Sequence, residues 1–478
     1  MTSYIPKFNS PVDLFNFIDK KGKNTIAFRW YDNNKNTIIT KTYHDYCEDI
    51  TKFINLYSEK NFKKKNIGIV AENSYHYAVN SFGIILMGGV VIPLNQNDSN
   101  EILYEEIEFS NIEHIFSDHS KEITNKNVCV YEINEYEQNK NNDIDFVSVS
   151  SSDIVAMVFT SGTTGKSKCA MFSWLNIDAA IYASSNYFVD AEKTTNKKAS
   201  SLISILPFYH VFGFIDMFVF LGTQKQQNLC TNIKHLRRDI QIFDNDFACA
   251  VPILLDGWAK ELSRNEKALG NIHSILYGGS TSSFETVKTL LEKNMCLIHA
   301  YGMTETTTIG LFCIMDKNSR HNLLGKPVKT MNVKIIDNEI CLSGPCVFSG
   351  YYKNEHDNDV EVKDGWLHTG DLGFMDDEGN VYMIGRKKNL IILESGENVS
   401  PEELEERIRK CDLVKEVVVV EKNKKICSVI YCDKEDQDKI KEHINNVNMN
   451  NPLYKRISII EFTDKPLDKT TTGKIKRN

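Results

Sequence analysis

The residues best suited to chemistry form a short segment rich in glycine, hydroxyl side chains and lysine, VFTSGTTGKSKCAM at positions 158–171. Its glycines can adopt backbone angles that are closed to other residues, so that successive N–H groups can converge on an anion. Its hydroxyl groups add hydrogen-bond donors, and its lysines add positive charge. The segment therefore predicts a phosphate-binding loop made of Thr160, Ser161, Gly162, Thr163, Thr164, Gly165, Lys166 and Lys168.

The loop is not a Walker A motif of the kinase and GTPase kind. That motif needs four residues between its glycines, whereas only Thr163 and Thr164 separate Gly162 from Gly165. Taken alone, the same composition also fits an exposed turn rich in glycine and threonine, and both interpretations stay open on these residues.

Three later apolar runs also end in residues that can bind ligands. Gly278, Gly279 and Ser280 follow the run SILY, residues 301–305 (YGMTE) follow MCLIHA, and His210 follows SLISILPFY. Ligands in open α/β sheets bind outside the carboxyl ends of the strands, which gives His210 a possible functional role. The mouths after SILY and MCLIHA resemble the predicted phosphate-binding loop, so we expect these three strand ends to lie in one sheet and to share one crevice. A histidine among aromatic residues is also typical of a packed core, and that alternative stays open for His210.

The elements that must position these residues alternate between helix and strand. Residues 43–57 carry apolar side chains at helical spacing, and residues 66–73 and 88–95 are apolar runs typical of buried strands, with a helix-like run between them. This β–α–β order predicts an α/β fold with mostly parallel sheets flanked by helices.

A smaller unit is predicted at the carboxyl end. Beyond Gly325 the sequence changes to short strands and turns, and a basic triplet begins at Arg386. Ser400 and Pro401 predict a helix start, which is followed by a strand pair that turns at residues 422–424. We therefore expect a large N-terminal domain, residues 1–385, and a small α+β domain, residues 386–478.

Composition limits the classes of function. The chain has 478 residues, enough for two or three domains, with 41% hydrophobic and 25% charged residues. Its formal net charge of −8 gives no general attraction to nucleic acid or to anionic membranes. The first fifteen residues lack the basic and apolar regions of a signal peptide, and the chain has no long uncharged apolar run. The 12 cysteines form no CxxC pair, which favours reduced thiols in a cytoplasmic protein.

An ordered set of motifs then identifies a family resemblance. The motifs are TSGTTGKSK, LPFYHVFGF, YGGS, YGMTET, GYY, GWLHTGD, GRKKNLII, GENVSPEELE and the terminal TTTGKIKR. In this order they resemble the adenylate-forming superfamily, which includes acyl- and aryl-CoA synthetases, the adenylation domains of peptide synthetases, and firefly-type luciferases. The resemblance implies ATP-dependent formation of an acyl-AMP, with release of pyrophosphate, followed by transfer of the acyl group to a thiol. It also implies a small β-barrel-like subdomain within the large domain and a mobile small domain.

The resemblance gives roles to the residues of the crevice. The predicted loop would hold the β- and γ-phosphates of ATP, Tyr301 would stack on adenine, and Thr304 would bind the α-phosphate. Glu305 would hold Mg²⁺, which suits a hard cation, although a carboxylate there could instead cap a helix. The remaining nucleotide contacts implied near these residues are Gly278, Gly279, Ser280, Gly302 and Met303.

Further roles fall on the carboxyl-terminal part of the chain. Asp371 would accept both ribose hydroxyls, and Arg386 would support the ribose or the phosphates. Lys474 resembles the lysine that bridges the carboxylate and the α-phosphate, although composition alone would make it a solvated charge. Lys388 matches the hinge about which the small domain rotates, and Gly396 would line the channel by which the thiol arrives.

The identity of the acid and of the thiol is less closely indicated. His210, predicted to flank the acid, stands where amino-acid-activating relatives have an aspartate, which favours an acid without an α-ammonium group. The aromatic residues around it, with Gly278, Gly279 and Ser280 opposite, favour an apolar or aryl tail. Ser167 and Cys169 replace the usual proline and glycine, which we expect to tune the loop. Family members use the small domain to contact CoA or a carrier protein, and its segment of residues 420–426 is shorter than usual. The thiol is therefore expected to be either CoA or the phosphopantetheine of a separate carrier protein. An inactive nucleotide-binding protein is the alternative of another class, and the joint presence of the predicted site residues argues against it.

Overall fold

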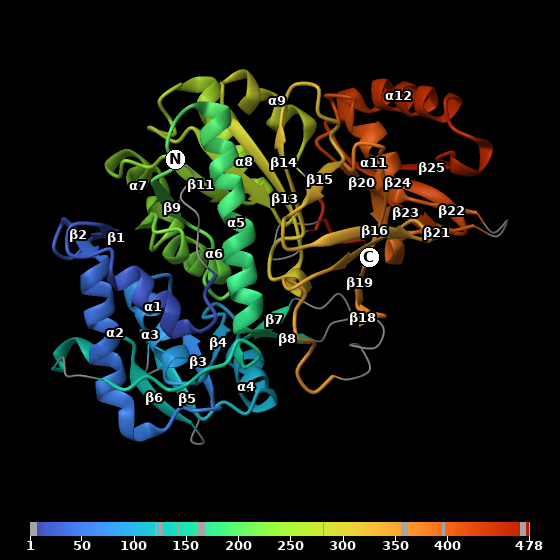
Figure 1. Cartoon of the computed structure of the whole chain (residues 1–478). Coiled ribbons are helices and arrows are strands. Elements are labelled where there is room, and N and C mark those ends of the chain that lie inside the picture. The colour runs from blue at the N-terminus through green and yellow to red at the C-terminus, as the bar shows by residue number, and fades with distance from the viewer. Residues whose placement is uncertain are drawn as a thin grey trace. The chain divides into compact units, whose positions relative to one another are not determined.

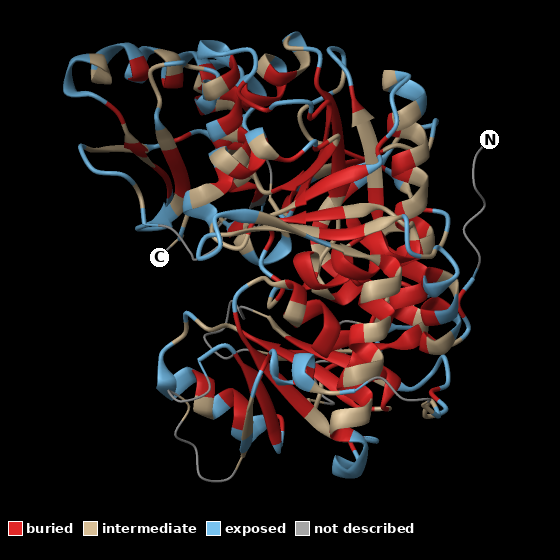
Figure 2. Cartoon of the chain, turned by 90° about the vertical axis from the view of Figure 1, so that its left-hand side faces the viewer, coloured by how far each residue is buried: buried red, intermediate tan, exposed pale blue. Residues whose placement is uncertain are grey.

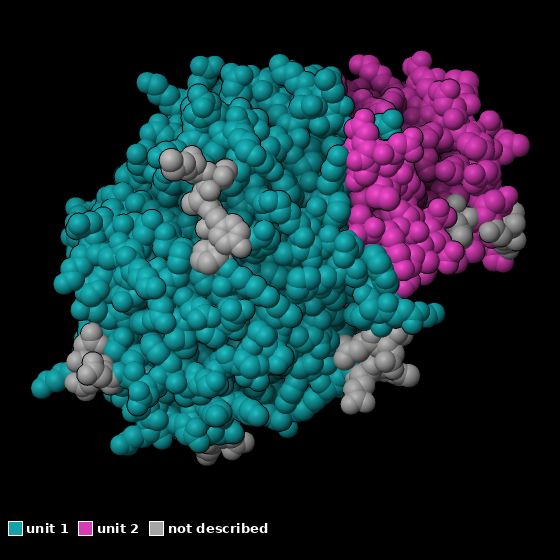
Figure 3. Space-filling model, in the orientation of Figure 1, with its two compact units in different colours: residues 1–332, 342–367 teal, residues 333–341, 368–478 magenta. Residues whose placement is uncertain are grey.

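The computed structural model describes residues 7–119, 123, 128–140, 144–160, 168–280, 282–354, 362–393, 397–468 and 475–477. The chain divides into two compact units, each described here by itself and coloured separately in Figure 3. Unit 1 comprises residues 1–332 and 342–367, and unit 2 comprises residues 333–341 and 368–478. The predicted α/β class is confirmed. The boundary after residue 385, which separates the large domain from the predicted mobile domain, stays a prediction.

The first sheet of unit 1 has the six-strand order β6-β5-β3-β4-β7-β8. Its strands run parallel except for β8, which is antiparallel to β7. Their bounds are β3 (Asn66–Val70), β4 (Val90–Leu94), β5 (His114–Ser117), β6 (Cys129–Glu132), β7 (Ile154–Thr160) and β8 (Lys168–Ser173). The two apolar runs predicted as strands within residues 66–95 are therefore confirmed as the parallel pair β3 and β4.

The second sheet of unit 1 has the order β15-β14-β13-β12-β11-β9-β10-β1-β2. It is parallel from β13 to β1, and β14, β15 and β2 run antiparallel to their neighbours. The bounds are β1 (Ile26–Asp32), β2 (Thr37–Thr42), β9 (Ser201–Ser204), β10 (Gln226–Leu229), β11 (Phe247–Ala250), β12 (Ser274–Gly278), β13 (Cys296–Tyr301), β14 (Leu311–Met315) and β15 (Leu323–Pro327).

Helices cover both faces of these sheets (Figure 1). Their bounds are α1 (Pro11–Asp19), α2 (Tyr43–Tyr57), α3 (Tyr75–Leu86), α4 (Asn100–Phe109), α5 (Trp174–Thr195), α6 (Val211–Gly222), α7 (Leu236–Ile242), α8 (Pro252–Arg264) and α9 (Phe284–Glu292). One core joins α7, α8 and α9 to β9, β11, β12 and β13. On α5, Tyr187 stacks on Phe247 of β11. Burial is concentrated in the strands and in the helix sides that face them (Figure 2).

Unit 2 contains most of the strand order β16-β17-β19-β20, in which β19 and β20 are antiparallel, a three-stranded sheet β23-β24-β25 and the pair β21-β22. The bounds are β16 (Asn332–Ile336), β17 (Glu339–Ser343), β19 (Trp366–Met375), β20 (Val381–Arg386), β21 (Ile391–Ile392), β22 (Asn398–Val399), β23 (Glu416–Lys422), β24 (Lys425–Tyr431) and β25 (Ile459–Thr463). The short strand β18 (Val362–Lys363), in unit 1, pairs with the start of β19. The helices are α11 (Pro401–Arg409) and α12 (Gln437–Met449).

Local sequence explains where several elements begin and turn. The Ser400 hydroxyl accepts the N–H of Glu403, and Pro401 occupies the first turn, so α11 begins where the sequence predicts. The tight turn between β23 and β24 is formed by Asn423 and Lys424, both with positive φ. One core packs α11 and α12 against the three-stranded sheet. Among the described residues, no helix is long and apolar enough to cross a membrane.

Candidate active site

Three of the predicted site segments lie at one edge of the second sheet. His210 follows β9, Gly278 ends β12 and Tyr301 ends β13, and these strands are parallel and joined through β11. Their carboxyl ends therefore point the same way, which is where an open α/β sheet binds its ligands. The expected shared edge is therefore present for the ends of β12 and β13. The expectation that the phosphate-loop strand lies in the same sheet was wrong, because β7 belongs to the six-stranded sheet.

The backbone after β13 is tightly packed and strained. A Cβ atom on Gly302 would collide with the carbonyl of Thr308, and one on Gly278 would lie 2.5 Å from the carbonyl oxygen of Ala300. Thr307 and Thr308 have φ values of 47° and 78°. Left-handed angles are unfavourable for β-branched residues, so the surrounding fold must hold this turn in place. Backbone strain of this kind is concentrated at functional sites. The packing that maintains it surrounds the turn next to Thr304 and Glu305.

Glu305 is the best-positioned candidate metal ligand. It lies in the short 3₁₀ helix η5 (Thr304–Thr306) and is 9% exposed. The Tyr351 hydroxyl donates a hydrogen bond to its Oε1 atom, and the N–H of Phe348 donates to its backbone carbonyl at 3.0 Å. The carboxylate is therefore held in one orientation by a segment some forty residues away.

Tyr351 also joins Glu305 to the end of the predicted phosphate-binding loop. The Nζ atom of Lys168 lies 4.7 Å from the centre of the Tyr351 ring, a cation–π distance. The backbone of Tyr351 bridges to Ala170 of β8, and Tyr352 donates its N–H to the carbonyl of Cys169 at 2.8 Å. A carboxylate and an ammonium group from different sheets thus contact one phenol. The sequence predicts no role for Tyr351, although this residue lies in the GYY motif.

The phosphate-binding loop itself connects two antiparallel strands. Thr160 of β7 and Lys168 of β8 are paired opposite each other at the base of the loop. The predicted loop residues Ser161, Gly162, Thr163, Thr164, Gly165 and Lys166 lie outside the described residues. Met303, Thr304, Tyr301 and Ser280 are partly exposed at the strand ends, and Gly279 is exposed with a φ of 81°.

His210 is not the packed core residue that its aromatic neighbours also allowed. It is exposed, although Phe208 and Phe214 around it are fully buried. Its Nδ1 atom accepts the N–H of Phe212 at 3.3 Å, so His210 caps the start of α6. The imidazole is therefore held at the strand edge with its other nitrogen directed away from the cap.

In unit 2, Asp371 and Arg386 face each other across β19 and β20. Arg386 Nε lies 2.9 Å from Asp371 Oδ1, and the Asp371 side chain is 4% exposed. Lys388 follows in the 3₁₀ turn η6 (Lys387–Asn389). Partial desolvation and then the Arg386 charge lower the pKa of Lys388, and the Asp371 charge opposes this change. The ribose, phosphate and hinge candidates therefore form one charged cluster.

Glu339 is a further buried carboxylate that fixes this cluster. It accepts the N–H of Gly370 at 2.8 Å and contacts His368 Nδ1 at 3.1 Å and Lys387 Nζ at 3.3 Å. Burial alone would raise its pKa, but the His368 and Gly370 hydrogen bonds and the Lys387 charge hold the pKa below its usual value. Glu339 thus ties the residue before Asp371 to the residue before Lys388. The sequence offered no signal for it.

Two further predicted site residues lie in undescribed segments. Lys474 and Gly396 lie outside the described residues. Within the described ranges, no group of three or more His, Cys, Asp and Glu side chains could hold a metal ion. Mg²⁺ is commonly bound by one or two carboxylates together with substrate phosphates, so Glu305 fits a site that is completed by the nucleotide.

Asp216 is a buried carboxylate on α6, 7% exposed. Burial raises its pKa to about 7, although the Cys249 thiol hydrogen-bonds to it. An unfolded aspartate has a pKa near 3.9. Because the folded protein holds the proton more tightly, stability is greatest below about pH 4 and falls as the pH rises towards 7.

Replacing Asp216 with asparagine is therefore expected to stabilise the protein more at high pH than at low pH. The Tm of Asp216→Asn relative to wild type should rise by about 5 °C between pH 4 and pH 8. Thermal unfolding of both proteins at intermediate pH values measures this difference. A constant difference across the range would mean that Asp216 does not titrate there.

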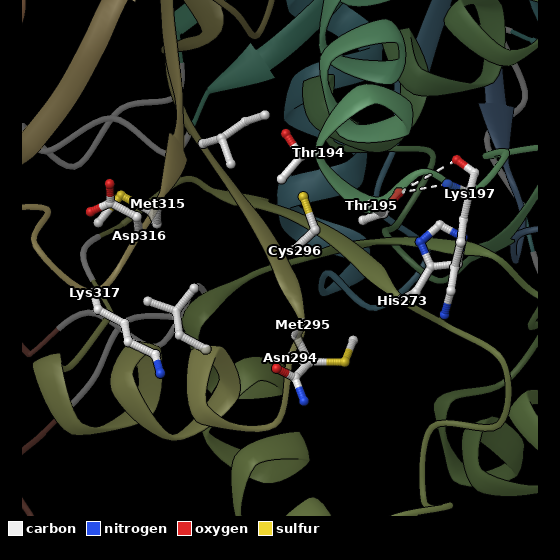
Figure 4. Close-up of a pocket in the computed structure, with 12 residues that line it drawn as sticks. Thr194, Thr195, Lys197, His273, Asn294, Met295, Cys296, Met315, Asp316 and Lys317 are labelled. Carbon is white, nitrogen blue, oxygen red and sulfur yellow. Dashed lines mark hydrogen bonds between the residues drawn. The ribbon is translucent and has the colours of Figure 1, made fainter.

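A cavity of about 480 Å³ opens elsewhere in unit 1 (Figure 4). It lies at the amino ends of β12 and β13, lined by His273, Cys296 and Lys317 together with the end of α5. Both ring nitrogens of His273 already contact protein atoms, the Ser274 hydroxyl at 2.9 Å and the Lys198 carbonyl at 3.1 Å. The cavity is thus at the edge opposite to the predicted site residues and is separate from them.

Comparison with known proteins identifies similar sequences along most of the chain. Residues 16–352 match the family described as AMP-binding enzyme, and residues 388–478 match the AMP-binding enzyme C-terminal domain. The chain is 25% identical to 4-coumarate–CoA ligase-like 1 of Arabidopsis thaliana, over 91% of this chain and 88% of that protein. It is 26% identical to 2-succinylbenzoate–CoA ligase of Bacillus cytotoxicus, over 76% of each chain.

A solved structure shares the fold. It is O-succinylbenzoate coenzyme A synthetase from Bacillus subtilis in complex with ATP and magnesium ion. The TM-score is 0.80 at 21% identity, covering 97% of this chain and 98% of that one.

Proposed function

Because the chain belongs to the AMP-binding enzyme family, within the adenylate-forming superfamily, we propose that it is an acid–thiol ligase. It activates a carboxylic acid with ATP to acyl-AMP and then forms a thioester with CoA. The observation that carries this proposal furthest is the contact of Tyr351 with both Glu305 and Lys168. Through Tyr351, a candidate metal ligand and the end of a candidate phosphate loop lie close together, next to the strained end of a strand.

In the first half-reaction, a carboxylate oxygen of the acid attacks the α-phosphorus of ATP. The bond from that phosphorus to the oxygen bridging to the β-phosphate breaks, and pyrophosphate leaves with the electron pair. Two anions must meet, so positive charge is needed around the phosphates. Lys168 and the loop before it take the departing end of ATP, and Thr304 binds the α-phosphate.

Glu305 is suited to hold Mg²⁺ together with the phosphate oxygens. The ion, when bound, offsets charge that develops on the phosphates. Tyr351 keeps the Glu305 carboxylate oriented, and Phe348 fixes the backbone behind it. Asp371, held by Arg386, accepts the ribose hydroxyls, and Tyr301 contacts the adenine.

In the second half-reaction, the thiol sulfur attacks the acyl carbon and AMP leaves, while the thiol proton passes to solvent. The small domain, residues 386–478, rotates about Lys388 between the two half-reactions, which removes Lys474 and presents the channel at Gly396. The charged contacts of Glu339 with Gly370 and Lys387 support a hinge at this position. Hinges absorb their motion in a few residues at the ends of elements, and η6 directly follows the end of β20.

CoA is favoured as the thiol because the named relatives are CoA ligases. The acid lacks an α-ammonium group, because the exposed imidazole of His210 supplies no fixed negative charge. Its tail is apolar or aryl, which the aromatic residues around His210 favour. Loading of a carrier protein is the alternative raised by the short segment of residues 420–426.

One panel of assays tests the proposal. Pyrophosphate release should require both ATP and an acid and should be fastest with apolar or aryl acids, each measured with and without CoA. CoA should be consumed in step with pyrophosphate release. Turnover without CoA consumption would favour a carrier protein, and absence of turnover with every acid would favour an inactive nucleotide-binding protein.

A further inference from the structure

The carboxyl-terminal tail is tied down on both sides of the segment that contains Lys474. The N–H of Leu467 donates to a Glu416 carboxylate oxygen at 2.7 Å, which anchors the chain to β23. The N–H of Lys476 donates to the Asp468 carbonyl at 2.8 Å. Residues 468 and 476 are thereby joined by a backbone hydrogen bond, and they flank the segment that contains Lys474.

Arg477 supplies that fixation. Its guanidinium contacts both carboxylate oxygens of Glu405 on α11, with Nη2 lying 2.9 Å from Oε2, and Nη1 donates to the Val419 carbonyl at 2.9 Å. Glu405 is buried, with a side chain 4% exposed, and it also accepts the Val419 N–H at 2.7 Å. A bidentate pair with a buried carboxylate fixes both distance and orientation. The tail is thus held to α11 and β23 at Arg477, the residue after Lys476.

Glu402 extends the same contact to the predicted hinge. Its Oε1 atom accepts from Arg477 Nη2 at 3.1 Å and from Asn389 Nδ2 at 2.6 Å. Asn389 ends η6, the turn that contains Lys388. One carboxylate therefore joins Arg477 to the turn about which the small domain, residues 386–478, is proposed to rotate.

We propose that Arg477 is a positioning residue for acyl-AMP formation. Paired with Glu405 and Glu402, it fixes the base of the loop carrying Lys474 to α11 and to the hinge turn. The contacts of Arg477 and Glu402 thus join the described end of the tail to the hinge turn. The proposal rests on the proposed function, and on Lys474 acting in the first half-reaction only.

Arg477→Ala is the direct test, because it frees the tail without changing Lys474. A misplacement of about 1 Å can cost about 10²-fold in rate, so acyl-AMP formation should fall by about 10- to 100-fold. Thioester formation from supplied acyl-AMP does not use Lys474 and should keep most of its rate. Arg477→Lys keeps the charge but loses the two-pronged contact, and it should give an intermediate loss.

Arg409→Ala is the matched control. Arg409 also contacts Glu405, at 3.6 Å, and donates to the Val417 carbonyl at 3.2 Å, but both contacts lie within α11 and β23. Its loss should leave both half-reactions within about twofold of wild type, since a half-exposed ion pair contributes little.

Removing Arg477 alone leaves the buried Glu405 carboxylate without its main partner and can impair folding. The double variant E405Q/R477M avoids this, because the amide oxygen of glutamine can still accept the Val419 N–H. It should show the same selective loss as Arg477→Ala. Hydrogen exchange should show faster exchange of the Lys476 amide in both variants, with the amides of α12 unchanged.

The outcomes separate the two proposals. Wild-type enzyme that adenylates, together with Arg477 variants that adenylate equally fast, would overturn the positioning role and leave the proposed function standing. Equal losses in both half-reactions would likewise overturn the positioning role. Wild-type enzyme that releases no pyrophosphate with any acid would overturn the proposed function, and the role of Arg477 within it.

Discussion

Replacement of Lys474 with alanine is expected to lower the rate of acyl-AMP formation by about 10²- to 10³-fold, the loss typical of one removed group that stabilises transition-state charge. The carboxylate and the α-phosphate repel each other as they approach, and the ammonium group offsets that repulsion. Thioester formation from supplied acyl-AMP should continue near the wild-type rate, because no new phosphorus bond forms in it. Pyrophosphate release without thiol, and thioester formation from acyl-AMP, measure the two steps separately.

Lys476→Ala is the control for this experiment. It removes the same charge two residues away, while its backbone N–H can still close the tail on Asp468. It should leave both rates within about threefold of wild type, as expected of an exposed, solvated charge. Equal loss of both half-reactions in Lys474→Ala would remove the role assigned to Lys474 and point to a structural one.

The elements that place the site were predictable because their signals are local. The apolar run before Thr160 forms β7, and the run before Tyr301 forms β13. Apolar runs that end in glycine and hydroxyl residues mark the carboxyl ends of buried strands, whatever the rest of the chain does. Since adjacent parallel strands share an edge, the meeting of β9, β12 and β13 followed from that reading.

The contacts that fix the site were not predictable, because they join residues distant in sequence. Tyr351 meets Glu305 across 46 residues, and Arg477 meets Glu405 across 72. Tyrosine and arginine occur on many surfaces, so composition and spacing do not distinguish these from solvated side chains. The strained angles of Thr307 and Thr308 are likewise set by tertiary packing, against the preference of the residue type.

His210 illustrates a conflict between two local signals. Its aromatic neighbours favour a buried ring, whereas its place before an apolar helix favours a capping role. The structure resolves the conflict in favour of the cap, because Phe208 and Phe214 fill the core and the imidazole is exposed. The same geometry keeps His210 at the edge where the acid is proposed to bind.

The hinge region shows how charged side chains can join distant motifs. Glu339 contacts Lys387 on one side of Lys388, and Glu402 contacts Asn389 on the other. Through these carboxylates the turn is tied both to the residue before Asp371 and to the tail beyond Lys474. Adenylation and thioester formation need different surroundings for one acyl-AMP. The Glu402 contacts lie after Lys388 and join residues that would move together, whereas the Glu339 contacts hold the side that carries Asp371.

Substitution of Glu305 by glutamine is expected to have the other large effect. Glutamine keeps an oxygen that can accept the Tyr351 hydrogen bond, so the variant removes the charge and little of the packing. A loss of about 10²-fold in kcat corresponds to about 2.7 kcal/mol, within the several kcal/mol that a bound metal ion supplies. The Mg²⁺ concentration for half-maximal rate should rise by about tenfold or more, because a neutral amide is a weaker ligand for a hard cation. A Mg²⁺ titration of pyrophosphate release measures both quantities.

Tyr351→Phe separates the metal role from a structural one. It keeps the Glu305 charge and the ring beneath Lys168, and it removes only the hydroxyl that orients the carboxylate. A net hydrogen bond contributes about 0.5–1.5 kcal/mol, so the Mg²⁺ requirement should shift by less than about tenfold. If Glu305→Gln left the titration unchanged and Tyr351→Phe lowered the rate as much as Glu305→Gln did, Glu305 would serve to hold Tyr351 in place. The metal would then need other ligands.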